Sequence, residues 1–426
     1  MEEIGIETIQ LMPGITLRCF PDQRFKQGCF SFQLVRPMAL EEASLNALIP
    51  AVLLRGSRRH PDLRSITVKL DELYGAMVSE MVRRVGDYQT TGLFCGFIED
   101  RFALPGEQVL PAMMEFLGEL LLEPLTENGT FVEEIVESEK KNLISAMDSQ
   151  RNDKRVYAMG QMLKSMCKED SYGIPRLGTR ETAAAITAKT LYAHYQKILR
   201  ESQLELFYVG SAPAEQVAVL LTPILKQIPR DYHPIGEQTP FTGAPAGEIT
   251  EETELTQARL CMGFTTSVRN ASPLYAAIQV FNALFGAGMT SKLFMNVREK
   301  QSLCYSIGSA YYGSKGMLTV AAGIDADKAE TVKAEILHQL RLCCEGQITD
   351  QEVEAARAAI LSSLRGTHDS LGAIEGFYST AKLSNLNLTP ESYAEQVQAV
   401  TREQIIEASR TVQLHTTYLL RGVTEK

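Results

Sequence analysis

The chain has 426 residues, of which 45% are hydrophobic, so it is long enough for two or three domains and apolar enough to give each a buried core. Its 42 basic and 52 acidic residues give a formal charge of −10, which argues against a nucleic-acid backbone or an anionic membrane surface as the main partner. No apolar run approaches the roughly 18 residues of a membrane-spanning helix, and the acidic N-terminus lacks the pattern of a secretory signal.

The first half of the chain mixes strand-like and helix-like segments. Runs rich in β-branched and aromatic residues predict strands, and apolar residues repeating every three or four positions predict helices. In chain order we expect strands at 15–20 and 29–36, helices at 41–54 and 63–73, strands at 76–84 and 88–98, and helices at 106–122 and 131–148.

The second half repeats this order. We expect a strand at 258–264, helices at 274–285 and 291–300, strands at 304–312 and 317–324, and helices at 326–344 and 350–364. The spacing from Gly56 to Gly286 equals the spacing from Leu73 to Leu303, which indicates duplication of a large module rather than a short-period solenoid. We therefore predict an α+β fold of two homologous domains, each a mainly antiparallel sheet covered by helices on one face.

The segment between the two halves has the composition of a linker. Residues 230–247 are rich in Pro and Gly and show little periodicity. The sequence therefore predicts an N-terminal domain at 1–229, a linker at 230–247 and a C-terminal domain at 248–426.

The eight cysteines and six histidines show no spacing typical of metal ligands. The cysteines form no C-x-x-C pair, and most lie inside apolar runs, which is typical of buried reduced thiols in a cytoplasmic protein. No two histidines are close enough in sequence to make a helical or hairpin ligand pair. We therefore expect neither a metal ion nor another cofactor.

The helix at 41–54 ends in a motif that resembles a known family. The sequence Leu-Leu-Arg-Gly-Ser at 53–57, followed by His-Pro at 60–61, is similar to the opening of the pitrilysin/insulinase metallopeptidases. In those enzymes this helix carries H-x-x-E-H, two zinc-ligating histidines and a general-base glutamate. Aligned on this motif, the histidine positions hold Ala47 and Ala51, and the glutamate position holds Pro50. The resemblance thus implies the frame of a zinc peptidase without its zinc chemistry.

The resemblance also implies where a third zinc ligand would lie. In the family it is a glutamate on a later helix, seven residues after another glutamate. The segment 139–146 is similar to that helix, with Glu139 at the first glutamate and Ala146 at the ligand position. All three ligand positions are therefore alanine, and we assign this helix no catalytic role.

The second half carries the other part of the resemblance. A glycine loop at 286–288, a helix ending in Arg-Glu-Lys at 298–300 and a strand beginning with Cys-Tyr at 304–305 are similar to the C-terminal half of the family. The family's arginine and tyrosine, which contact substrate backbone and help to stabilise the tetrahedral intermediate, match Arg298 and Tyr305. A guanidinium and a phenol are both donors suited to a developing oxyanion. The alternative is an ordinary surface arginine near a helix end and a half-buried strand tyrosine.

The resemblance spans nearly the whole chain and implies a subunit rather than an enzyme. In single-chain members four such domains close as a clamshell, with zinc in the first domain and the Arg/Tyr pair in the fourth. A two-domain chain with Arg298 and Tyr305 but no zinc helix resembles the second half of that clamshell. We expect a non-catalytic, substrate-binding subunit of a heterodimeric zinc peptidase, which binds peptide and completes the active site of an H-x-x-E-H-bearing partner.

Two other classes of function stay open. The chain could be an assembly scaffold that kept the peptidase fold and has no role in proteolysis, or a self-sufficient hydrolase with other chemistry. No Ser/His/Asp or Cys/His cluster stands out, which disfavours the hydrolase. A neighbouring gene for an H-x-x-E-H relative would favour the subunit over both alternatives.

Overall fold

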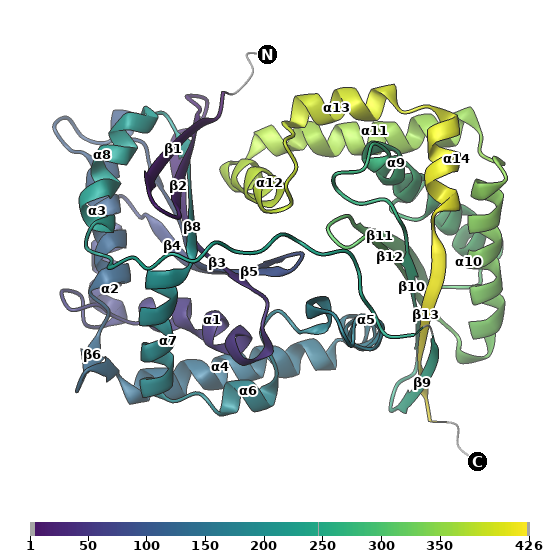
Figure 1. Ribbon diagram of the computed structural model, residues 1–426, viewed down its shortest axis with the longest axis horizontal. Helices are drawn as coiled ribbons and strands as arrows, with labels where there is room; N and C mark the ends of the chain where they lie inside the picture. Colours follow the sequence, from purple (N-terminus) through teal and green to yellow (C-terminus); the bar gives the residue numbers. More distant parts are fainter. Residues whose placement is uncertain (1–4, 246, 424–426) are drawn as a thin grey trace. The chain divides into compact units, whose positions relative to one another are not determined.

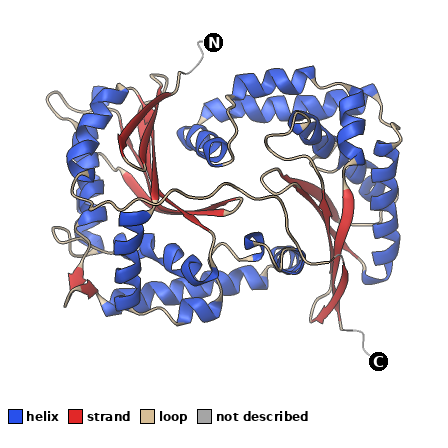
Figure 2. Cartoon of the chain, viewed as in Figure 1, coloured by secondary structure: helices blue, strands red, loops and turns tan. Residues whose placement is uncertain are grey.

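Residues 5–245 and 247–423 are described in a computed structural model of the chain, shown in Figure 1 by chain position and in Figure 2 by secondary structure. The chain divides into two compact units. Unit 1 comprises Met1–Met147, Pro175–Glu237 and Ser370–Thr380, and unit 2 comprises Asp148–Ile174, Gln238–Asp369 and Ala381–Lys426. Within the described ranges, no helix is both long enough and apolar enough to cross a membrane.

Unit 1 is built on a six-stranded sheet in the order β1-β2-β8-β3-β5-β4. Its strands are β1 (Glu7–Met12), β2 (Ile15–Pro21), β3 (Gln27–Pro37), β4 (Met77–Val85), β5 (Tyr88–Ile98) and β8 (Gln203–Gly210). Its helices are α1 (Leu40–Leu53), α2 (Leu63–Glu72), α3 (Val109–Leu122), α4 (Glu133–Asn152, up to Met147), α6 (Arg180–Ala184), α7 (Ala188–Glu201) and α8 (Ala214–Leu225). A small hairpin joins β6 (Thr126–Glu127) to β7 (Thr130–Phe131). Neighbouring strands of the large sheet run antiparallel, except for the parallel pair of β2 and β8.

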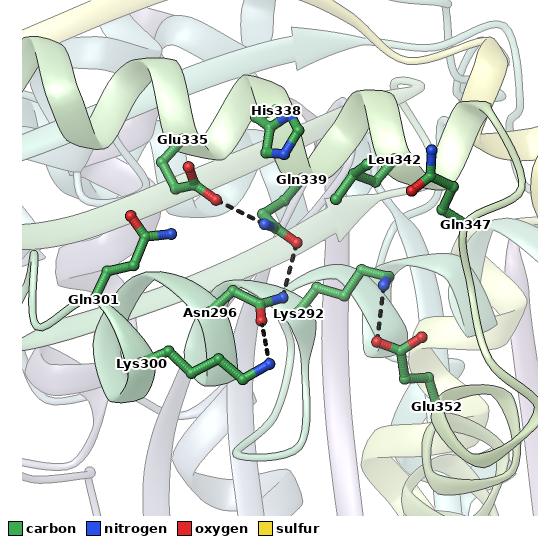
Figure 3. Close-up of a pocket in the computed structure, with 10 residues that line it drawn as sticks. All are labelled: Lys292, Asn296, Lys300, Gln301, Glu335, His338, Gln339, Leu342, Gln347 and Glu352. Carbon is green, nitrogen blue, oxygen red and sulfur yellow. Dashed lines mark hydrogen bonds and ion pairs between the residues drawn. The ribbon is translucent and has the colours of Figure 1, made fainter.

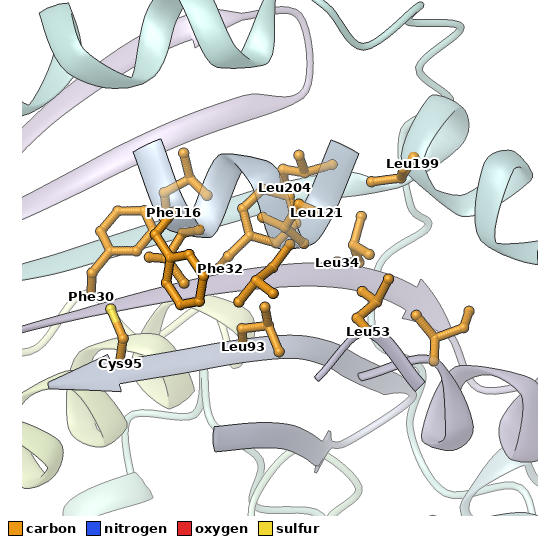
Figure 4. Close-up of a cluster of buried hydrophobic side chains, with 14 of the residues drawn as sticks. Phe30, Phe32, Leu34, Leu53, Leu93, Cys95, Phe116, Leu121, Leu199 and Leu204 are labelled. Carbon is orange, nitrogen blue, oxygen red and sulfur yellow. The ribbon is translucent and has the colours of Figure 1, made fainter. Parts of the chain in front are cut away.

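The main core of unit 1 lies between one face of this sheet and the helices. Alternate residues of a strand point to the same face, so every second residue of β3, from Phe30 to Leu34, enters this core. Figure 4 shows side chains of α1, α3 and α7 meeting those of the strands. The labelled residues are Phe30, Phe32, Leu34, Leu53, Leu93, Cys95, Phe116, Leu121, Leu199 and Leu204.

The opposite face of the unit 1 sheet is covered by a helix from the second half of the sequence. This helix is α12 (Leu371–Leu383), and unit 1 includes its residues up to Thr380. Tyr378 stacks on Phe20, with ring centroids 4.4 Å apart. Glu375 is fully buried, lies 2.8 Å from the Arg83 guanidinium and accepts a hydrogen bond from Ser31 Oγ at 2.8 Å. The buried charge is therefore paired and hydrogen-bonded, as a carboxylate without solvent requires.

Unit 2 is built on a five-stranded sheet in the order β11-β12-β10-β13-β9. Its strands are β9 (Gly247–Thr253), β10 (Ala258–Thr265), β11 (Ser306–Tyr312), β12 (Met317–Ile324) and β13 (Gln413–Gly422). Its helices are α9 (Tyr275–Phe285), the π-helix η3 (Leu293–Lys300), α10 (Ala329–Cys344), α11 (Asp350–Gly366), α13 (Pro390–Ala399) and α14 (Arg402–Arg410). The predicted helix at 291–300 is thus a wider π-helical turn, a rare form that is found often at functional sites.

A helix from the first half of the sequence covers the second face of the unit 2 sheet. This helix is α5 (Lys154–Met166), which lies across the sheet from α10 and α14 (Figure 1). Its Met162 and Met166 pack against Cys261 and Tyr418. A side chain on Gly263 would collide with these methionines, because an added Cβ would lie 2.4 Å from Met166 Sδ. The helix and the sheet therefore approach closely at this glycine.

A buried ion pair fixes the segment after α5 within unit 2. Lys315 Nζ lies 2.9 Å from Asp170 Oδ1, and the two side chains are 0% and 1% exposed. The Asp170 carboxylate also accepts the backbone N–H groups of Tyr172, at 2.8 Å, and of Thr242, at 3.0 Å. The Lys315 ammonium donates to Thr239 Oγ1 at 3.1 Å. Each buried charge therefore has its opposite charge and further polar partners.

The two sheets have the same topology, which confirms the predicted fold of two homologous α+β domains. The order β2-β8-β3-β5-β4 in unit 1 corresponds strand for strand to β9-β13-β10-β12-β11 in unit 2. In both sheets the first pair of this series is parallel and the others are antiparallel. The covering helices α5 and α12 also occupy equivalent places in the repeat, after α4 and α11. Helices therefore cover both faces of each sheet, where the sequence predicts only one covered face.

The segment between the halves is extended. Residues 230–245 form neither helix nor strand, and the compact units change over between Glu237 and Gln238. The compact units differ from the predicted domains at 1–229 and 248–426, because each unit takes a helix from the other half of the sequence. The predicted ranges refer to the homologous halves and stay a prediction.

Candidate functional site

The α1 helix places the zinc-motif positions in an apolar environment. Ala47 is 4% exposed and belongs to the unit 1 core, Pro50 is buried, and Ala51 is partly buried. Two methyl groups and a pyrrolidine ring offer no lone pair to a metal ion, so these residues do not fit zinc. Across residues 5–245 and 247–423, no three or more His, Cys, Asp or Glu side chains form a group that could hold a metal.

The proline in α1 is supported by the sheet beneath it. Pro50 has no backbone N–H, so the Asn46 carbonyl loses its usual donor in the helix. The hydroxyl of Thr91, on β5, donates to that carbonyl at 2.5 Å. A strand side chain thus replaces the missing helical hydrogen bond, and the fold accommodates proline where an active relative needs its general base.

A buried polar network lies beside the same turn of α1. The Asn46 side-chain amide donates to Gln89 Oε1 at 2.9 Å, and His194 Nε2 lies 2.7 Å from Asn46 Oδ1. Because Asn46 donates through its nitrogen to Gln89, its oxygen accepts from His194, which fixes the Nε2–H form of the imidazole. Burial lowers the pKa of His194 to about 4, so the ring is neutral at physiological pH.

This histidine is expected to make the protein less stable in mild acid. The pKa of His194 falls from 6.5 to about 4 on folding, so between these values the unfolded chain holds a proton that the folded chain lacks. The contribution of His194 to the free energy of unfolding should therefore have its full value above pH 6.5. As the pH falls from there to about 4, the free energy of unfolding should decrease by about 1.4 kcal/mol for each pH unit. Urea unfolding at a series of pH values measures this slope.

Two variants separate His194 from the carboxylates that titrate in the same range. His194→Gln keeps a donor for Asn46 but cannot be protonated, so it should flatten much of the slope. His233→Gln, at a histidine whose side chain is 66% exposed, is the matched control and should retain the wild-type slope. Identical slopes for wild type and His194→Gln would contradict the prediction.

The third ligand position, Ala146, is exposed on α4. The glutamate of the same segment, Glu139, is instead buried and pairs with Arg55 Nη1 at 2.7 Å. Arg55 belongs to the turn that follows α1, so this ion pair joins α4 to the motif helix. Glu139 is therefore engaged in a structural contact.

The Arg298–Tyr305 pair is brought together by the turn between η3 and β11. Ser302 has a left-handed φ of 50°, which turns the chain back towards the helix. Arg298 Nε then donates to the Tyr305 backbone oxygen at 3.0 Å, and its guanidinium lies 4.6 Å from the centre of the Phe294 ring. The Arg298 side chain is 38% exposed, and its Nη1 lies 3.3 Å from Glu299 Oε1. The arginine is thus anchored through Nε while remaining partly open to solvent.

The Tyr305 side chain is exposed and lies just outside the strand. Its relative exposure is 58%, in contrast to the half-buried strand tyrosine of the alternative interpretation. Its hydroxyl donates to Asp325 Oδ1 at 2.7 Å, and this hydrogen bond raises the pKa of Tyr305. Lys328 lies 2.9 Å from the same carboxylate and lowers the pKa of Asp325. The hydroxyl therefore keeps its proton at neutral pH and can act as a donor.

Comparison with known proteins relates this architecture to a peptidase family. The family model described as "Peptidase M16 inactive domain" matches residues 185–360. A protein of Bacillus subtilis (strain 168), named "Probable inactive metalloprotease YmfF", is 30% identical over 409 residues, which is 96% of this chain and 96% of that protein. The chain belongs to the peptidase M16 family. It is an inactive, non-catalytic member, in agreement with Ala47, Pro50 and Ala51.

Other M16 relatives and solved structures agree with this membership. The crystal structure of a conserved protein from Enterococcus faecalis V583 has a TM-score of 0.90 and 28% identity, and the alignment covers 99% of each chain. A peptidase M16 inactive domain from Pseudomonas fluorescens shares the fold, with a TM-score of 0.81, 16% identity and coverage of 99% of this chain and 98% of that one. A Bacillus subtilis (strain 168) protein named "Uncharacterized zinc protease YmxG" is 27% identical over 201 residues, 46% of this chain and 47% of that protein.

A polar pocket of about 470 Å³ lies beside η3 but does not include Arg298 or Tyr305. Figure 3 shows its lining, in which Lys292 pairs with Glu352 at 2.8 Å and Asn296 donates to Gln339 at 2.9 Å. The full lining is Lys292, Asn296, Lys300, Gln301, Glu335, His338, Gln339, Leu342, Gln347 and Glu352. The pocket contains neither motif residue, so the exposed Arg298–Tyr305 pair is kept as the candidate site of this M16 chain.

Purified protein is expected to contain no stoichiometric zinc and to cleave no peptide by itself. The reason is that the family's three ligand positions hold Ala47, Ala51 and Ala146. Elemental analysis after dialysis against a weak chelator measures bound zinc, with an H-x-x-E-H relative treated in parallel as the positive control. Zinc retained at one ion per chain would contradict the prediction.

Proposed function

We propose that this chain is the non-catalytic, substrate-binding subunit of a heterodimeric zinc peptidase in the cytoplasm. It associates with an H-x-x-E-H-bearing subunit, binds part of the peptide and completes the partner's active site. The observation that carries this proposal is the exposed Arg298–Tyr305 pair, which persists although the zinc-ligand positions are alanine. An exposed, ordered pair of donors has no role in the core of unit 2.

The geometry of the pair suits it to an anionic oxygen. The bond to the Tyr305 carbonyl and the ring of Phe294 hold the Arg298 guanidinium in place before any ligand arrives. Donors that are already oriented need little reorganisation when charge develops on a substrate oxygen. The Tyr305 hydroxyl must exchange Asp325 for the substrate, and Lys328 then continues to balance the Asp325 carboxylate.

The comparisons support a pair of proteins rather than a lone one. Bacillus subtilis (strain 168) holds both an M16 relative with "inactive metalloprotease" in its name and a relative named as a zinc protease. The cysteines support a reducing compartment, because all eight are free thiols and all but Cys344 are buried.

The test is reconstitution with an H-x-x-E-H relative encoded in the same genome. We expect the two chains to co-elute in equal amounts on size exclusion and to cleave an unstructured peptide that neither chain cleaves alone. Co-elution without any gain in cleavage would instead favour the assembly scaffold, and the absence of a complex would contradict the heterodimer.

A further inference from the structure

Arg259 is a partly buried charge that has no partner. It lies on β10, inside the unit 2 sheet. Its buried Nε has no hydrogen-bond partner, and its guanidinium makes no ion pair with any residue that the structure describes. A charged group that loses water without gaining a partner is costly, so such a group is retained where something else supplies the opposite charge.

The guanidinium of Arg259 lies across β12, towards the edge of the sheet. Arg259 and Ser306 are both paired in register with Gly323, on opposite sides of it. A Cβ added to Gly323 would lie 2.2 Å from Arg259 Nη1 and 2.9 Å from Ser306 Oγ. The missing side chain at Gly323 therefore leaves the space in which the guanidinium lies, next to the edge strand β11.

This position adjoins the Arg298–Tyr305 pair. The Tyr305 backbone N–H donates to the Gly323 oxygen at 2.8 Å, so the glycine beneath Arg259 also holds Tyr305. Ser306, the next residue, is exposed and offers a hydroxyl on the Arg259 side. A peptide bound at Tyr305 would thus pass close to Arg259.

The nearby Asp153 carboxylate attracts Arg259 electrostatically but forms no ion pair with it. Arg155, on α5, forms a two-contact pair with Asp153, with Nε and Nη2 at 3.2 and 3.0 Å from the carboxylate. Burial, and then the like charge of Arg155, lower the pKa of Arg259, but the group remains an arginine and stays protonated. The Asp153 carboxylate is therefore committed to Arg155, and Arg259 Nε is left without an acceptor.

We propose that Arg259 binds a carboxylate of the peptide held at Arg298 and Tyr305, an inference that rests on the proposed function. The planar guanidinium fork matches a carboxylate with two parallel hydrogen bonds. The carboxylate is either an acidic side chain or the free C-terminus of the peptide. Arg259 thereby gives this subunit a preference for peptides that place either an acidic side chain or a free C-terminus at this position.

The test measures binding of short labelled peptides to the full chain by fluorescence anisotropy. Three peptides share one neutral sequence: one carries a glutamate and a C-terminal amide, one carries a free C-terminal carboxylate, and one carries neither. We expect wild type to bind one of the first two about tenfold more tightly than the neutral peptide. The preferred peptide identifies the source of the carboxylate.

Three variants test whether the preference originates at Arg259. Arg259→Gln should remove it, whereas Arg421→Gln, at an exposed arginine of the same sheet that pairs with Glu252, should keep it. Gly323→Ala changes no charge but displaces the guanidinium, and should also remove it. The nearest atom, Arg259 Nη1, ends a flexible side chain, and Ser306 Oγ at 2.9 Å is a hydroxyl that can change rotamer, so this variant is expected to fold.

Three outcomes would overturn the inference, and they differ in what they imply for the proposed function. If all three peptides bind equally and Arg298→Ala weakens them together, peptide binding stands and Arg259 is not a carboxylate subsite. If no peptide binds at concentrations where the heterodimer cleaves it, both proposals fail. A preference that survives Arg259→Gln would also exclude Arg259 as its origin.

Discussion

Replacing Arg298 with alanine is expected to slow peptide cleavage by the reconstituted heterodimer by about 10²–10³-fold. The variant loses a donor that the fold orients before substrate binds, through the 3.0 Å bond to the Tyr305 carbonyl. Because the Arg298 side chain is 38% exposed, the free energy of unfolding should change by only about 0.5 kcal/mol. The measurement is kcat/KM for the wild-type and variant complexes at matched stoichiometry.

Two further variants make this result specific. Tyr305→Phe keeps the ring and removes only the hydroxyl, and should reproduce much of the defect. Arg410→Ala is the matched control, because Arg410 Nε also donates to a backbone carbonyl, that of Cys344, at 3.0 Å. The control should leave the rate unchanged. Equal rates for wild type, Arg298→Ala and Tyr305→Phe would eliminate the shared active site and leave the scaffold as the better account.

Replacing Lys315 with methionine is expected to destabilise the protein by about 3–5 kcal/mol. Methionine fills a similar volume but leaves the Asp170 carboxylate buried without its opposite charge, and both side chains of the pair are at most 1% exposed. Denaturant unfolding of the variant measures the loss. Lys69→Met removes a lysine that pairs with Glu72 at 3.5 Å on the surface of α2, and this control should cost less than about 1 kcal/mol.

A double variant distinguishes the unpaired charge from lost packing. Lys315→Met combined with Asp170→Asn removes both charges and keeps one acceptor oxygen, for either the backbone N–H of Tyr172 or that of Thr242. It should be clearly more stable than Lys315→Met alone, because the uncompensated carboxylate is gone. If the double variant is as unstable as the single one, the ion pair is not the source of the effect.

Local pattern and duplication together predict much of the fold. The strands β3, β4, β5, β10, β11 and β12 lie where alternating and β-branched segments place them. The predicted elements omit β8 and β13, which lie inside the two sheets, because a short apolar run such as 204–209 does not by itself distinguish a strand from a buried helix. The repeat, if followed to the C-terminus, provides the missing signal.

The covering helices α5 and α12 show a different limit of sequence reasoning. Periodicity indicates which face of a helix is buried, but not which sheet buries it. For α5 that sheet includes Cys261 and Tyr418, far along the chain. The polar residues Ser31 and Gln33, which alternate with apolar residues along β3, would suggest a face open to solvent. Both are in fact completely buried and donate to Glu375 of α12.

The candidate site, like the fold, could be predicted from the sequence only in part. Motif positions identify Ala47, Pro50, Ala51, Arg298 and Tyr305, because these depend only on residue order. The hydroxyl of Thr91 that replaces the helical donor, and the unpartnered guanidinium of Arg259, depend on cross-strand register and on a neighbouring glycine. Such relations arise only when strands distant in sequence are paired.

The exchange of α5 and α12 has a consequence for how the protein is made. During synthesis, all strands of the unit 1 sheet have been made once the ribosome passes residue 210. The helix that covers the second face of this sheet is complete only beyond residue 380. Until then Phe20, Phe207 and Val209 have no covering helix, and the nascent chain exposes an apolar surface that invites aggregation. A gene fragment cut in the linker would carry the same open face. The two halves are products of duplication, but neither is expected to be an independent folding unit.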